Sequence, residues 1–211
     1  MARRTKNAPA GAGASIAYDT PMDPSALAAR VLDFWFGPPP LAPRAAWFGK
    51  DVAFDDSIRH RFGDAIEQAL SGGLGDWEAT SRGALARIVV LDQFTRNAYR
   101  DTPRAFAGDA LALAGATRLV DSGRDRDLAH VERWFAYLPF EHAEDAAAQA
   151  RSLVLFERLA ADSGDPSPLE WARRHADVIR RFGRYPHRNA ILGRASTPGE
   201  VAFLLEPGSR F

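Results

Sequence analysis

The chain has 211 residues, 46% of them hydrophobic and 26% charged, which is typical of an ordinary globular protein in water and is enough for a substantial core. Lysine plus arginine and aspartate plus glutamate each number 27, so no net field draws the molecule to nucleic acid or an anionic membrane. The lack of cysteine excludes disulfides, thiolate metal ligands and a cysteine nucleophile, and it fits the reducing cytoplasm.

Residues 1–22 are predicted to form a disordered tail, because they combine basic residues with alanine, glycine, proline and serine and lack an apolar stretch. Residues 23–211 are predicted to form a single all-helical domain, since no alternation with a period of two persists along them. No apolar run approaches the roughly 20 residues that a membrane-spanning helix requires.

About eight helices are predicted, joined by short loops into antiparallel pairs. In chain order they cover residues 24–36, 54–70, 81–97, 109–123, 128–138, 144–161, 168–182 and 198–205. Asp109 is expected to cap the fourth helix, and Pro139 is expected to close the fifth. Gly183 suits the left-handed residue that ends the seventh helix, and Thr197 begins a capping box for the last.

The connection after the seventh helix concentrates polar side chains among turn-forming residues: Arg184, His187, Arg188, Asn189 and Arg194. Guanidinium groups this close repel one another unless carboxylates or a bound anion lie among them. Two interpretations therefore stand. The arginines pair with internal acids and carbonyl groups, or they line a pocket for a phosphate or a carboxylate.

A second cluster, Glu141, His142, Glu144 and Asp145, is expected at a helix start. Acidic residues there complement the helix dipole, and Glu141 or His142 can simply cap the helix. The alternative is an acid–base or metal site, in which His142 and Asp145 share a helix face. Neither Glu-x-x-His nor His-Glu-x-x-His occurs in the chain, so no metal ligands are predicted.

A third cluster lies on the third predicted helix: Asp92, Arg96, Asn97 and Arg100. Asp92 falls on the face expected to be buried, and a buried carboxylate needs a partner. Arg96, four residues later, is the default partner. The alternative pairs Asp92 with Arg184 or Arg188 and so joins this helix to the C-terminal connection. His175, in the middle of the seventh helix, is interpreted as a core or boundary residue.

These segments together resemble a bacterial family known as domain of unknown function 924. The resemblance rests on Phe34-Trp35-Phe36-Gly37, Trp47-Phe48 and the stretches 91–97, 139–145 and 181–197, in order along the chain. It implies an all-helical, tetratricopeptide-like array and no particular activity. Ala143 stands where that family commonly has serine, so a hydroxyl group is not essential at this position.

The leading hypothesis is a cytoplasmic protein that binds, or binds and transforms, a small anionic ligand. The residues expected to hold the anion are Arg96, Asn97, Arg100, Arg184, Arg188, Asn189 and Arg194. Proton transfer is assigned to His142 or His187, with help from Glu141, Asp92, Glu144 or Asp145. The alternative is a helical module that binds a peptide or protein without catalysis. The sequence indicates no cofactor, and its neutral charge does not favour nucleic acid.

Overall fold

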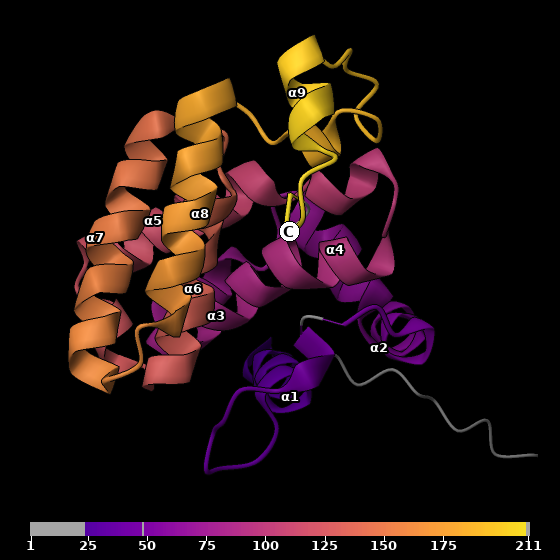
Figure 1. The fold of residues 1–211 in the computed structure, drawn as a ribbon. Coiled ribbons are helices and arrows are strands. Elements are labelled where there is room, and N and C mark those ends of the chain that lie inside the picture. Colours follow the sequence, from indigo (N-terminus) through magenta and orange to yellow (C-terminus); the bar gives the residue numbers. More distant parts are fainter. Residues whose placement is uncertain (1–23, 48, 210–211) are drawn as a thin grey trace, which may run out of the picture.

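The computed structural model describes residues 24–47 and 49–209, and every regular element in these ranges is helical (Figure 1). The all-helical prediction is therefore confirmed. The α-helices are α1 (Pro24–Phe36), α2 (Val52–Leu70), α3 (Ser81–Ile88), α4 (Thr95–Ala98), α5 (Asp109–Asp121), α6 (His130–His142), α7 (Ala146–Ser163), α8 (Ser167–Phe182) and α9 (Pro198–Phe203). The predicted tail, residues 1–22, lies outside the described residues, and the domain boundary and the tetratricopeptide-like arrangement stay predictions.

Short helical turns connect these elements. A π-helical segment, Val89–Phe94, joins α3 to α4, so that the third predicted helix exists as one run with a widened middle. The 3-10 turns are Ala45–Trp47, Gly75–Ala79, Pro103–Phe106, Arg124–Asp127 and Pro186–Arg188. Counting α3, the π segment and α4 as one helix leaves eight helices in the described part of the chain.

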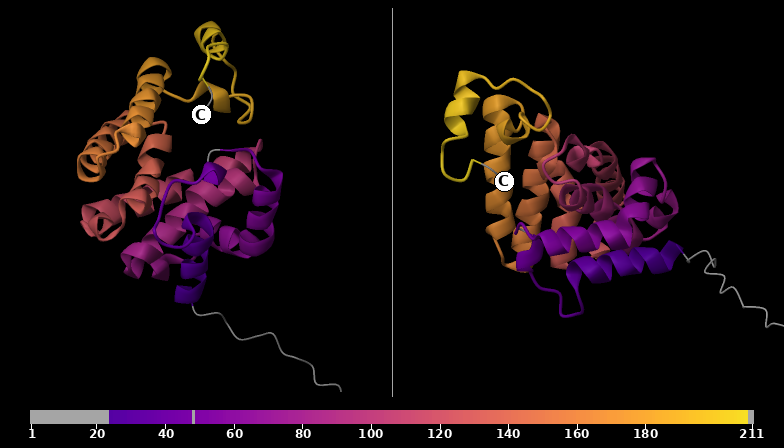
Figure 2. Two further views of the ribbon diagram at one scale, coloured as in Figure 1. Left: turned by 60° about the horizontal axis from the view of Figure 1, so that its bottom comes forward. Right: turned by 90° about the vertical axis from the view of Figure 1, so that its right-hand side faces the viewer.

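Helix α6 is the centre of the arrangement, because it packs against α3, α5, α7 and α8. Helices α7 and α8 lie side by side on one flank, and α1 to α4 form the other (Figures 1 and 2). The C-terminal segment, residues 183–209, leaves the end of α8 and carries α9 (Figure 2). Its Arg188 reaches back to Asp109 at the start of α5.

Aromatic side chains fill the core between the two flanks. Trp35 of α1 is fully buried, with its ring centroid 5.5 Å from that of Phe135 on α6 and 5.7 Å from that of Phe94. Phe94 in turn lies 4.9 Å from Phe62 of α2. Large buried rings stabilise a helical domain through the apolar area they remove from water, about 25 cal/mol per Å².

Local signals located most helix ends. Gly183 ends α8 in the left-handed conformation (φ 71°), and the Thr197 side chain caps α9, as predicted. The predicted N-cap of α5 was wrong: Gly108 is the N-cap and Asp109 lies in the first turn. The Asp109 carboxylate binds Arg96 instead of the free N–H groups of its own helix.

The prediction that Pro139 ends the fifth helix was also wrong. Pro139 lies inside α6, which continues to His142. Gln149 Nε2 donates to the carbonyl oxygen of Glu141 (2.7 Å), and the Tyr185 hydroxyl donates to the same oxygen. These bonds from residues outside α6 stabilise its last turn, after Pro139. The rule that proline ends a helix considers only neighbouring residues, so it could not predict them.

Candidate functional site

Asp92 lies in the π-helical segment and is completely buried. Its Oδ1 lies 2.9 Å from Arg96 Nη1 and 2.8 Å from His142 Nδ1. The predicted ion pair with Arg96 is confirmed. The alternative pairing of Asp92 with Arg184 or Arg188 is wrong, because Arg184 pairs with Glu200 and Arg188 pairs with Asp109.

Two backbone carbonyl oxygens in the π segment accept hydrogen bonds from side chains. Thr95 Oγ1 donates to the carbonyl oxygen of Leu91 (2.8 Å), and Arg96 Nη1 donates to that of Asp92 (2.6 Å). π-Helical turns of this kind occur frequently at functional sites, since they move a side chain out of its regular position.

Asp109 reaches this group because α5 begins almost in contact with the π segment. A Cβ atom on Gly108 would lie 2.1 Å from the carbonyl oxygen of Leu91, so only glycine permits this approach. Arg96 donates to both oxygens of Asp109, at 2.8 and 3.1 Å. Such a bidentate pair fixes the guanidinium plane between Asp92 and Asp109.

His142 is the last residue of α6, and its side chain is 14% exposed. Asp92 is ionised: burial alone would raise its pKa, but Arg96 and His142 outweigh burial and lower it. An ionised carboxylate only accepts hydrogen bonds, so the proton on His142 is assigned to Nδ1. Burial lowers the pKa of His142, with Asp92 opposing the shift and Arg96 adding to it. The neutral ring then keeps a basic lone pair on Nε2.

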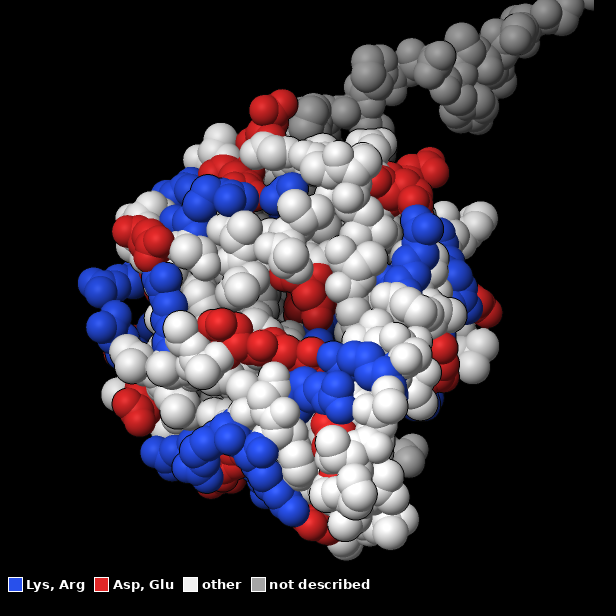
Figure 3. Space-filling model, turned by 90° about the horizontal axis from the view of Figure 1, so that it is seen from above, with Lys and Arg blue, Asp and Glu red and all other residues white. Residues whose placement is uncertain are grey.

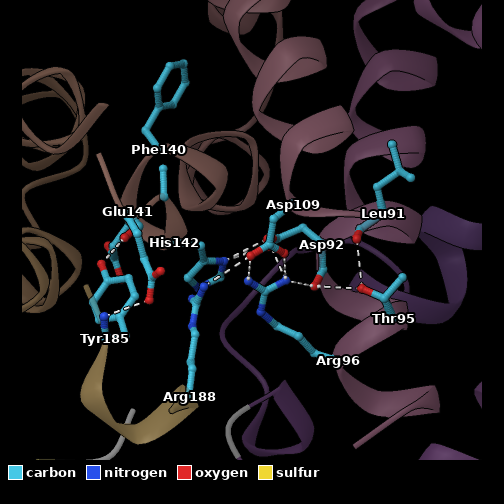
Figure 4. Close-up of polar contacts among 12 residues, drawn as sticks. Leu91, Asp92, Thr95, Arg96, Asp109, Phe140, Glu141, His142, Tyr185 and Arg188 are labelled. Carbon is cyan, nitrogen blue, oxygen red and sulfur yellow. Dashed lines mark hydrogen bonds and ion pairs between the residues drawn. The ribbon is translucent and has the colours of Figure 1, made fainter. Parts of the chain in front are cut away.

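Arg188 approaches the same group from the C-terminal segment (Figure 4). Its guanidinium carbon lies 4.7 Å from the ring centroid of Phe106 and 4.6 Å from that of Tyr185. Nη1 donates to Asp109 Oδ2 at 3.2 Å, and Nε is buried without a hydrogen-bond partner. Burial lowers the pKa of Arg188, and the positive charge of Arg96 adds to this effect. We call Asp92, Arg96, Asp109, His142 and Arg188 the ionic cluster.

A pocket of about 400 Å³ opens beside the ionic cluster. It lies between α5, the end of α6 and the C-terminal segment, and we call it the Arg188 pocket. Four of its eleven lining residues are polar or charged: Asp109, His142, Glu144 and Arg188. The rest are apolar, with Phe106, Leu113 and Leu192 the largest. Its size is that of a site for a small molecule.

A second acid–histidine pair lies behind the first. Glu141 precedes His142 on α6, is 2% exposed, and places Oε1 3.0 Å from His175 Nδ1 of α8. Glu141 Oε2 is buried without a hydrogen-bond partner, and the rings of His142 and His175 lie 6.3 Å apart. The interpretation of His175 as a core or boundary residue agrees with its 6% exposure.

Protonation of the buried groups predicts a stability maximum near pH 6.5. Burial, with the charge of Asp92, raises the pKa of Glu141 to about 8, and burial lowers the pKa of His175 and of His187 to about 3. Unfolded values are near 4.3 for Glu and 6.5 for His. Between pH 6.5 and 8 the folded state binds more protons, so stability falls as pH rises. Below pH 6.5 the unfolded state binds protons on His175, on His187 and also on His142, whose folded-state pKa is lowered too. These protons outweigh the one on Glu141, so stability falls again as pH falls, by about 1.4 kcal/mol per pH unit for each net proton.

Urea unfolding at pH 5.5, 6.5 and 8 tests this profile. Glu141→Gln serves as the matched variant, because it removes the proton that the folded state retains and should flatten the limb above pH 6.5. A free energy of unfolding that rises steadily from pH 5.5 to 8 in the wild-type protein contradicts the assignment.

The structure does not place Glu141, His142 and Asp145 on one helix start as expected. Glu141 and His142 end α6, whereas Asp145 caps α7, with its side chain accepting from the Ala148 N–H at 2.8 Å. The shared helix face of His142 and Asp145 was therefore a wrong prediction. Nothing in the local pattern shows that the chain continues helically through Pro139.

Most of the other predicted site residues bind internal groups. Arg184 pairs with Glu200, and Arg194 pairs with Glu144 at 2.6 and 2.9 Å. Arg100 pairs with Asp55. The predicted ligand asparagines do likewise: Asn97 Nδ2 donates to the Gln93 carbonyl oxygen and Asn189 Nδ2 donates to Ser196 Oγ.

His187 lies with its ring centroid 5.6 Å from that of Tyr185. Ligand roles for Arg100, Arg184, Arg194 and the two asparagines, and a catalytic role for His187, stay predictions. Arg96, His142, Arg188 and Asp92 are the predicted residues that meet at one place, and Glu141 lies beside His142 on the side of Tyr185 (Figure 4).

Sequence reasoning missed Asp109, Phe106 and Tyr185 as parts of this site. The sequence did show Asp109 as an acidic residue at a helix start, but helix capping explains such a residue equally well. Phe106 and Tyr185 carried none, because an aromatic residue that stacks on an arginine looks like a core residue in sequence.

Among residues 24–47 and 49–209, no group of three or more histidine, aspartate or glutamate side chains is arranged to hold a metal ion. No helix in this part of the chain is long and apolar enough to cross a membrane. Acidic and basic side chains adjoin one another over the face seen in Figure 3, and neither sign covers it.

Comparison with known proteins agrees with the resemblance. Residues 31–208 match the family described as "Bacterial protein of unknown function (DUF924)". A solved structure, that of a protein of unknown function, ATU0120, from Agrobacterium tumefaciens, is similar with 41% sequence identity and a TM-score of 0.79. The similarity covers 87% of this chain and 99% of that one. No curated protein matches the chain.

Proposed function

This chain belongs to the bacterial DUF924 family, and we propose from its site that the Arg188 pocket binds a small anionic ligand, with His142 as the group that exchanges a proton with it. The observation that carries the proposal is Arg188. Asp109 is its single ion-pair partner among residues 24–47 and 49–209, at 3.2 Å, although the side chain is only 7% exposed. A guanidinium group has five N–H donors, and burial makes unused ones costly.

The rest of the cluster supports an anion at this arginine. The guanidinium group lies over the rings of both Phe106 and Tyr185, and these contacts order it before a ligand arrives. Arg96 contributes a second positive charge nearby, which together with burial lowers the pKa of Arg188. An anion beside Arg188 relieves this repulsion.

His142 supports proton exchange at the same place. His142 is one of the residues that line the pocket, and Asp92 orients its ring through Nδ1. In this arrangement His142 is the base and the Asp92 carboxylate positions it, so Nε2 of His142 is the atom that can accept a proton. We further propose a cytoplasmic location, which the lack of cysteine supports.

Thermal unfolding in the presence of small carboxylates and phosphate esters tests the proposal. A ligand at about 100 times its dissociation constant should stabilise the folded state by roughly 2.7 kcal/mol. We expect Arg188→Gln to abolish the shift, measured from the variant's own melting temperature. Arg180→Gln on α8 is the matched control and should retain the shift, because Arg180 is exposed and pairs only with Asp177 in the described structure.

A second variant guards against misfolding of Arg188→Gln. Ala110→Trp places a large side chain into the pocket from an exposed position on α5 and removes no buried interaction. It should block the shift while leaving the fold intact. If no anion shifts the wild-type protein, the proposal fails and the peptide- or protein-binding alternative becomes the better one.

A further inference from the structure

The charges around the Arg188 pocket are balanced before any ligand arrives. Arg96 and Arg188 face Asp92 and Asp109 within the ionic cluster. The remaining carboxylate of the lining, Glu144, is neutralised by Arg194 and also accepts from the Tyr185 N–H at 2.7 Å. An added anion therefore leaves the site with an uncompensated charge unless a proton enters with it.

His142 is the group placed to take up that proton. Asp92 and Arg96 face it from the π segment and α4, Arg188 and His187 from the C-terminal segment, and His175 from α8. Its own helix adds Glu141, which is neutral near pH 7. Of these, Asp92 contacts the ring directly, and two arginines oppose protonation. An anion within the pocket favours the protonated ring, because His142 lines the same pocket and a nearby negative charge stabilises the positive form of histidine.

The number of positive groups limits the charge of the ligand. Arg96 donates to both oxygens of Asp109 and contacts Asp92, so two carboxylates already compensate its charge. Arg188 Nε is buried without a hydrogen-bond partner, and protonated His142 adds one more positive charge. One negative charge is matched by this change, whereas a second would remain unpaired beside the buried side chains of Asp92 and Arg188.

The lining of the pocket also limits the shape of the ligand. Seven of the eleven lining residues are apolar, and Phe106, Leu113 and Leu192 present the largest apolar surfaces. A planar carboxylate suits the edge of a single guanidinium group that lies over two aromatic rings. The rest of such a ligand, attached to the carboxylate, would contact the apolar side chains of the lining.

We propose that the ligand of the Arg188 pocket is a monocarboxylate with an apolar body, and that His142 takes up one proton when it binds. This inference rests on the proposed function and deepens it. It excludes phosphate monoesters, which are dianions above neutral pH, as the preferred ligands.

Calorimetric titration of the full chain at pH 7.8 with hexanoate and with hexyl phosphate tests the inference. Tris and triethanolamine are suitable buffers, because they differ in ionisation enthalpy and add no buffer anion. We expect hexanoate to bind at least tenfold more tightly than hexyl phosphate. The apparent enthalpy should differ between the buffers by the amount for one proton taken up. Affinity should rise roughly fourfold per methylene from propionate to hexanoate.

Two further measurements assign the proton to His142. The dissociation constant of hexanoate should rise with pH, by up to tenfold per unit, in the range between the pKa values of free and bound His142. His142→Gln should lose the dependence on buffer and on pH, and circular dichroism checks its fold. The pH series uses the wild-type protein, so it remains informative if the variant does not fold.

The outcomes separate the two proposals. Tighter binding of hexyl phosphate, or binding of hexanoate without proton uptake, overturns this inference and leaves the anion site in place. Failure of both ligands to bind, together with no thermal shift from any anion, overturns the proposed function as well. Binding that survives in Ala110→Trp places the ligand outside the Arg188 pocket and overturns the inference too.

Discussion

Gly108→Ala is expected to destabilise the folded protein by about 3 kcal/mol or more, at the upper end of the cost of overpacking a core. The added Cβ atom would lie 2.1 Å from the carbonyl oxygen of Leu91 and 2.9 Å from its carbonyl carbon. Both are backbone atoms of the π segment, so no side-chain rotation relieves the clash. The start of α5 must move away, and Asp109 moves with it out of reach of Arg96 and Arg188.

Urea unfolding monitored by circular dichroism measures this cost, and Gly63→Ala is the matched control. Gly63 lies within α2, and a Cβ atom there meets nothing within 4 Å. Alanine is the better helix former, so this variant should gain up to about 1 kcal/mol. If Gly108→Ala is as stable as the wild-type protein, the close packing of α5 on the π segment is wrong.

Asp92→Asn is expected to cost about 3 kcal/mol, because it removes the carboxylate of a buried ion pair and leaves the charge of Arg96 undercompensated. The amide keeps the shape of the side chain, so packing changes little. The loss should be largest near neutral pH. The folded-state pKa of Asp92 is lowered, so the stability from this group is present above its unfolded pKa near 3.9 and is lost as pH falls.

Asp121→Asn is the control for Asp92→Asn. Asp121 pairs with Arg151 at the surface, where its side chain is 60% exposed. Exposed pairs contribute about 1 kcal/mol or less, so the two substitutions remove the same chemical group in opposite environments. Similar costs at pH 7 for the two variants would contradict the burial of Asp92. His142 should also lose its fixed orientation in Asp92→Asn, which weakens any proton exchange at the pocket.

Local patterns predicted those features that depend on residues close in sequence. The apolar stripe of α2, the left-handed Gly183 and the cap at Thr197 each follow from contacts within about four residues. The pair of Asp92 and Arg96 belongs to the same class, because four residues span one helical turn. Neutral net charge and the lack of cysteine likewise needed no structure.

Tertiary structure alone decided how the site is assembled. Asp92 and His142 are 50 residues apart, and Asp109 and Arg188 are 79 apart. Their meeting depends on the close approach of α5 to the π segment. It depends equally on the bonds from Gln149 and Tyr185 that extend α6 past Pro139. The physical reason is that a local pattern determines which face of a helix is apolar, whereas the packing of several helices determines which polar groups at their ends share one buried space.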